Sequence, residues 1–209
     1  GGMPSIGLTF SVLAKNKKYV LGVISQILYV GAQIMCWTYI YQYAEGIGMD
    51  SVTAGYYQMA AFVLFTVGRA VGTYMLRFLS PGKLLANFAI LAMVCVAGTI
   101  WIEGMVGLYC LVGISFFMSL MFPTIYGIAL NDLTEEQSKV GSAGLIMAIV
   151  GGALMPKLQG MIIDAGGNGV ADTTIMGVSE VNFSFILPLL CFVYIAWYGM
   201  RVFKKYENA

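Results

Sequence analysis

Six long, mostly apolar stretches follow one another along this 209-residue chain, separated by short polar connections. A helix that crosses the hydrocarbon core of a membrane needs about 20 predominantly apolar residues. Because no water is available in that core, the backbone of each segment must satisfy its own hydrogen bonds, which favours helices. The sequence therefore predicts an all-α integral membrane protein with a six-transmembrane-helix bundle. The predicted spans are 19–43, 52–78, 84–102, 105–130, 140–163 and 181–202.

The composition excludes several other classes of protein. Charged residues make up 10% of the chain and hydrophobic residues 59%, whereas a soluble domain carries roughly 25% charged residues. A soluble enzyme, a nucleic-acid-binding protein and a disordered tail are excluded on this ground. The chain has no His, and its four Cys are isolated within apolar runs, so the pattern predicts no metal site, no disulfide framework and no cofactor. A membrane enzyme is disfavoured, because the sequence shows no cluster of nucleophile, base and metal ligands.

The basic residues predict how the spans are oriented. If both termini are cytoplasmic, the Lys and Arg outside the spans and at their ends all fall on the inner side, and the outer loops carry acidic residues only. This bias is the positive-inside pattern of membrane proteins. Residues 1–18 then form a cytoplasmic loop segment, 19–205 the transmembrane bundle and 206–209 a cytoplasmic tail.

Small residues form a stripe on the fifth predicted span. Gly144, Ala148 and Gly152 recur every fourth residue, a spacing that lets the backbone of another helix come close. The fourth, fifth and sixth spans also contain prolines, which remove a helical hydrogen bond and bend the helix. The prolines are Pro123, Pro156 and Pro188. Such helices either pack a static bundle closely or bend and rock against one another.

Two faces of the predicted helices combine aromatic and polar residues. Gln33, Trp37 and Tyr41 share one face of the first span, and Phe122 and Tyr126 share one face of the fourth. A Gln in hydrocarbon must face protein or a watery cavity, and aromatic rings beside an amide suit a sugar, which has an apolar face and a rim of hydroxyls. We interpret the five residues as a candidate substrate site. The alternatives are an aromatic belt at the membrane interface for the first span and simple packing for the fourth.

Arg69 is a charge within the second span, where burial is costly. Asp132 lies at the inner end of the fourth span, so the two predict a pair that closes a cytoplasmic gate. The alternative is that Arg69 extends to the inner headgroups.

Several segments resemble a known family. Gly68, Arg69, Gly72 and the later Arg77 resemble the second copy of the cytoplasmic loop motif of the major facilitator superfamily. Other segments resemble its L-fucose:proton symporter branch, over nearly the whole chain. They are 29–37, 122–126, 131–133, 139–143, 151–152, 155–156 and 164–168.

This resemblance implies the C-terminal half of a twelve-helix fold, with an N-terminal six-helix half as its partner. It implies proton-coupled sugar transport by alternating access in a bacterial inner membrane, with a monosaccharide, the lipid bilayer and the other half as partners and no nucleic acid. The coupling carboxylates are expected in the other half. The alternatives are a glucose/galactose or N-acetylglucosamine carrier of the same branch, a non-transporting fragment, and a half-size protein that dimerises.

Overall fold

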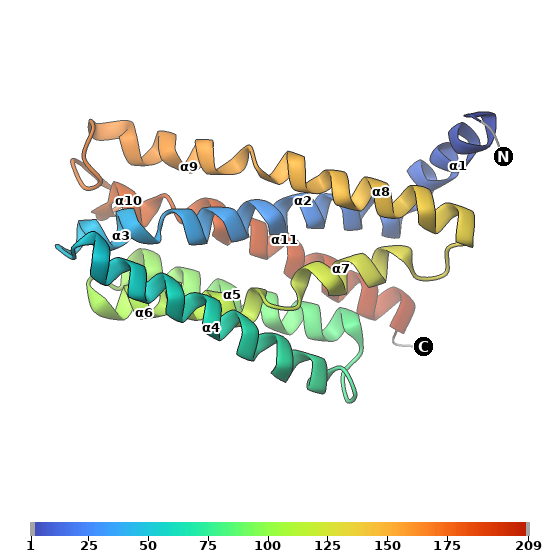
Figure 1. The fold of residues 1–209 in the computed structure, drawn as a ribbon, viewed down its shortest axis with the longest axis horizontal. Helices are drawn as coiled ribbons and strands as arrows, with labels where there is room; N and C mark the ends of the chain where they lie inside the picture. Colours follow the sequence, from blue (N-terminus) through green and yellow to red (C-terminus); the bar gives the residue numbers. More distant parts are fainter. Residues whose placement is uncertain (1–2, 208–209) are drawn as a thin grey trace.

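The computed structural model describes residues 3–207, with side chains from residue 6 onward. Residues 1–2 and 208–209, the outer ends of the predicted loop and tail, lie outside the described residues. The chain forms an elongated bundle whose long helices run side by side (Figure 1). The helices are α1 (Met3–Lys15), α2 (Lys17–Thr38), α3 (Ile40–Gly46), α4 (Ser51–Met75), α5 (Pro81–Trp101), α6 (Met105–Met118), α7 (Met121–Leu130), α8 (Glu135–Gly152), α9 (Met155–Ile163), α10 (Glu180–Phe183) and α11 (Ile186–Val202), with a 3₁₀ turn at Asp164–Gly166 and a π-helical turn at Phe203–Glu207.

Five helical segments are long and apolar enough to cross a membrane: Lys17–Thr38, Pro81–Trp101, Met105–Leu130, Glu135–Gly166 and Glu180–Glu207. They correspond to five of the six predicted spans. The remaining predicted span, 52–78, is α4, which has 25 residues. Its polar residues, among them Gln58 and Arg69, lower its hydropathy. At 1.5 Å per residue α4 is still longer than the roughly 30 Å hydrocarbon core, and its assignment as a sixth span stays a prediction.

The first residues of the chain are helical in the structure, although the sequence suggested a loop there. α1 runs from Met3 to Lys15, and α2 begins directly afterwards at Lys17. The Asn16 side chain caps α2 by accepting a hydrogen bond from the Tyr19 amide at 3.2 Å. Such a cap satisfies one of the free N–H groups at a helix start, so α1 and α2 meet at a sharp, defined corner.

Each of the three proline-containing spans is broken just before its proline. α6 gives way to α7 ahead of Pro123, α8 to α9 ahead of Pro156, and α10 to α11 ahead of Pro188. Proline fits the first turn of a helix, where its missing N–H is not needed. The structure therefore replaces the predicted bends with short helix breaks.

α2 lies at the centre of the bundle and packs against α7, α8 and α11. The contact between α2 and α8 is especially close. A Cβ added to Gly152 would lie 2.8 Å from both the Gly31 amide nitrogen and the Ile27 carbonyl oxygen, and one added to Gly144 would collide with the Tyr19 hydroxyl. Ala148, between them on the stripe, is buried at 3% exposure. The small residues of α8 thus lie where the backbones of α2 and α8 approach each other.

A short antiparallel hairpin, β1 (Thr174–Ile175) and β2 (Val178–Ser179), joins α9 to α10. Its turn uses positive φ angles at Met176 and Gly177, as a two-residue hairpin turn requires. The Glu180 side chain, fully buried, holds this loop together. Its two carboxylate oxygens each accept a 2.9 Å hydrogen bond, one from the Gly166 amide and one from the Asp172 amide.

Candidate functional site

The break between α6 and α7 leaves one backbone carbonyl without its helical partner. The Ser119 oxygen would normally accept from the amide four residues later, but that residue is Pro123, which has no N–H. Arg69 of α4 supplies the missing donor, since its Nε donates to the Ser119 oxygen at 3.2 Å. Its guanidinium also lies 5.2 Å from the centre of the Phe65 ring. Arg69 therefore binds the broken helix, although the residue itself stays exposed.

The predicted gate between Arg69 and Asp132 is not made in this structure, in which both residues are described. Asp132 is instead ion-paired with Lys18, at 3.8 Å between the carboxylate oxygen and Nζ. Arg69 donates instead to the Ser119 carbonyl that Pro123 leaves free. The gate is predicted for a closed cytoplasmic side, so the pairing of Arg69 with Asp132 stays a prediction.

An aromatic group joins α2 to α7. The Phe122 and Tyr126 rings stack at 6.4 Å between centroids with a 17° interplanar angle, and Tyr29 of α2 lies 6.3 Å from the Phe122 ring. Phe122 and Tyr126 are each half-buried, so one side of the pair remains accessible. The structure thus brings the two predicted residues of the fourth span together and adds Tyr29 to them.

Trp37, by contrast, packs mainly toward α4 and α6. Its ring lies edge-on to Phe62 and Phe65, at 4.9 and 5.2 Å between centroids. Its Nε1 donates to the Ser115 hydroxyl at 3.0 Å, so the indole N–H is already used within the bundle. Only the remaining ring surface of Trp37 is free for another contact.

Gln33 and Tyr41 occupy the more open part of the same helix face. Gln33 is half-buried, and no side-chain hydrogen bond joins it to another described residue. Tyr41 is 41% exposed and lies on α3, beyond the short interruption that ends α2. Within residues 3–207, no group of three or more Cys, Asp or Glu side chains is placed to hold a metal ion. The site offers aromatic surface and an amide, which suit an uncharged polar ligand.

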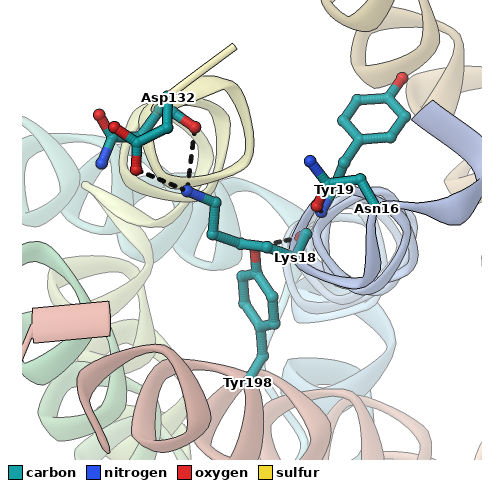
Figure 2. Close-up of polar contacts among 6 residues, drawn as sticks. Asn16, Lys18, Tyr19, Asp132 and Tyr198 are labelled. Carbon is teal, nitrogen blue, oxygen red and sulfur yellow. Dashed lines mark hydrogen bonds and ion pairs between the residues drawn. The ribbon is translucent and has the colours of Figure 1, made fainter. Parts of the chain in front are cut away.

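Two residues that contact the site from α2 were not among those predicted. Gln26 is completely buried, and its Nε2 donates to the Phe122 carbonyl at 3.3 Å. Lys18 is 6% exposed, and its Nζ donates to the Asn131 carbonyl at 2.9 Å (Figure 2). Gln26 lies seven residues before Gln33 and so on the same helix face, a spacing that would have identified it.

A cavity of about 470 Å³ opens beside Lys18 at the end of the bundle where both described chain ends lie. Its lining includes Asn131, Asp132 and Glu207. The Glu207 carboxylate accepts from the Gly82 amide at 3.0 Å, so the end of the described chain is attached to the start of α5.

Comparison with known proteins gives a consistent result, although no family model matches the chain. The chain is 51% identical over 203 residues to the L-fucose-proton symporter of Haemophilus influenzae, covering 97% of this chain and 46% of the relative. A crystal structure of the Escherichia coli fucose:proton symporter, FucP, aligns with a TM-score of 0.84 and 32% identity over 92% of this chain and 44% of that one. Nearly the whole chain is therefore similar to somewhat less than half of the L-fucose:proton symporters, which are major facilitator superfamily transporters.

Other relatives of the chain differ in the sugar they are named for. The chain is 32% identical over 184 residues to the glucose/galactose transporter of Brucella abortus, covering 87% of this chain and 41% of the relative. The chain therefore spans slightly less than half the length of the curated relatives it matches. These relatives are transporters rather than enzymes, and the predicted fold class, a helical membrane bundle of the major facilitator type, is confirmed.

Proposed function

We propose that this chain is the C-terminal half of a secondary active sugar transporter, and that the sugar is L-fucose, carried in symport with protons. The observation that carries the proposal is the likeness to fucose:proton symporters over nearly the whole chain, at about half of their length. Nine of the eleven Lys and Arg residues lie at or next to the starts of α2, α5 and α8 or the ends of α1, α4 and α11. These helix ends lie on one side of the bundle (Figure 1), which supports a bacterial inner-membrane location with both termini cytoplasmic.

The partly buried side chains of Phe122, Tyr126 and Gln33 are the proposed sugar wall of this half. Stacked rings offer their faces to the apolar face of a sugar, and the Gln33 amide offers both a donor and an acceptor to hydroxyl groups. Trp37 and Tyr41 extend this wall toward the end of the bundle that carries the predicted outer loops. In alternating access, the two halves rock about such a midplane site and expose it to each side in turn.

Proton coupling is proposed to reside in the N-terminal half. The Asp and Glu residues of this chain lie in loops and at helix ends. Glu180, the one that is fully buried, already accepts two backbone hydrogen bonds. Both of its oxygens are therefore already engaged in holding the loop between α9 and α10.

The N-terminal half is proposed to pack against α8 and α9 and against the outer face of α4. The Glu135–Gly166 segment is the least buried of the five candidate spans, and its exposed residues include Met147 and Val150. Val63 and Val67 are exposed on α4. These faces leave apolar surface for another helical bundle.

Uptake of labelled L-fucose tests the proposal. The chain is expressed alone, or joined to its N-terminal half, in cells without a sugar carrier of their own. We expect uptake only from the joined protein, with unlabelled L-fucose the strongest competitor. Uptake by the chain alone would favour a half-size protein that dimerises. Stronger competition by glucose or galactose would favour the activity for which the Brucella abortus relative is named.

A further inference from the structure

α7 is a short helix of 10 residues that is detached from α6 by the break before Pro123. It carries the stacked rings of Phe122 and Tyr126. Because its backbone hydrogen bonds do not continue into α6, side-chain contacts must fix its orientation in the bundle.

Gln26 of α2 holds the first turn of α7 through the 3.3 Å bond from its Nε2 to the Phe122 carbonyl. The side chain is completely buried, and its Oε1 has no hydrogen-bond partner within the described part of the chain. Burying a half-satisfied amide costs free energy that a Leu or Met would not incur. The unsatisfied amide oxygen of Gln26 therefore lowers the stability of the fold. What the side chain contributes is its hydrogen bond to α7.

Lys18 of α2 holds the other end of α7. Its ammonium group donates to the carbonyl of Asn131, the residue that caps α7, at 2.9 Å, and it lies 3.8 Å from the Asp132 carboxylate (Figure 2). A cation is favoured at a helix C-terminus, where the free carbonyls concentrate negative charge. The Tyr198 hydroxyl of α11 donates to the Lys18 carbonyl at 2.9 Å and so fixes the backbone behind it.

The two contacts match in spacing. Lys18 and Gln26 lie eight residues apart on α2, or roughly 12 Å along a helix. Phe122 and Asn131 lie nine residues apart along α7, or roughly 13 Å. One face of α2 therefore contacts both ends of α7 without strain in either helix.

We propose that Gln26 and Lys18 are positioning residues that hold α7 on α2 as one rigid unit and so fix the Phe122–Tyr126 wall against the sugar. This inference rests on the proposed function, because it takes that wall to be a sugar-binding surface. Neither residue is proposed to touch the sugar.

Amide hydrogen exchange provides a test that needs no substrate. In the transporter with both halves present, Gln26→Leu and Lys18→Met should each speed exchange in peptides covering 121–130 by roughly three- to tenfold, the effect of losing one net hydrogen bond. Peptides from α5 and α11 should be unchanged. Lys17→Met removes an exposed neighbouring cation, and Gln33→Leu removes an amide from the same helix; both should leave exchange in 121–130 as it was.

Transport kinetics provide the second readout. Gln26→Leu and Lys18→Met should raise the KM for L-fucose by a similar factor with a smaller change in kcat, and Lys18→Arg should restore most of both properties. Unchanged exchange in 121–130 would overturn the proposal, as would faster exchange with an unchanged KM. If the unsubstituted transporter takes up no sugar, the proposed function fails, while the exchange experiment still decides whether the two residues hold α7.

Discussion

The close contact between α2 and α8 predicts the effect of adding a single methyl group. Gly152→Ala would place a Cβ 2.8 Å from the Gly31 amide nitrogen, the Ile27 carbonyl oxygen and the Val30 Cβ. Ordinary contacts to carbon lie at about 3.5–4.0 Å, so the new atom is at least half an ångström too close to each. Two of the three neighbours are backbone atoms, which cannot rotate away. α2 and α8 must therefore separate.

The expected cost follows from that separation. Overpacking a tight contact destabilises by roughly 1–3 kcal/mol, and a loss of about 2 kcal/mol lowers Tm by roughly 4–8 °C in a protein of this size. The assay is thermal unfolding of the detergent-solubilised protein, followed by fluorescence-detected size-exclusion chromatography. Gly31→Ala should cost less, since its Cβ would meet the flexible Met155 side chain rather than backbone.

Gly113→Ala is the matched control. A Cβ at Gly113 of α6 meets nothing within 4 Å. Alanine there should be neutral or stabilise by roughly 0.4–1 kcal/mol, because it restricts the unfolded chain. If Gly152→Ala melts at or above the temperature of Gly113→Ala, the close approach of α2 and α8 is refuted.

Two further substitutions test buried polar contacts by the same thermal assay. Tyr43→Phe removes a buried hydroxyl that donates to a carbonyl of α5 at 2.8 Å and should cost roughly 1–3 kcal/mol. Tyr41→Phe, at an exposed position, should change Tm little. Equal effects of the two substitutions would show that the Tyr43 hydrogen bond does not stabilise the bundle. Glu180→Gln leaves one of the two backbone N–H groups facing an amide nitrogen. The substitution should therefore destabilise the protein by a comparable amount and speed proteolysis of the 164–179 loop. Glu45→Gln, at an exposed position, should do neither. A loop no more sensitive to protease in Glu180→Gln would show that the carboxylate does not hold it.

The sequence predicted the helical class well, because apolar runs of membrane-spanning length leave little choice of structure. It also predicted that Phe122 and Tyr126 share a face, since a spacing of four residues places side chains together on a helix. Gln26 is recognisable in the same way, because it lies seven residues, or about two turns, before Gln33 and so on the same helix face.

The partners of Arg69 and Lys18 were not predictable in this way. Arg69 binds the Ser119 carbonyl, and that carbonyl is free only because Pro123 follows on a separate, short helix. Lys18 binds the end of α7 from a point 113 positions away in the chain. Both contacts depend on how broken helices pack in three dimensions, and no spacing in the sequence encodes that packing.

The most direct test of the central account is the dependence of L-fucose accumulation on a proton gradient. The chain joined to its N-terminal half is reconstituted into vesicles, and labelled L-fucose is followed under an imposed inward proton gradient, with and without a protonophore. The account predicts accumulation above the outside concentration that the protonophore abolishes. Accumulation that persists with the protonophore, or that follows a sodium gradient instead, would contradict it.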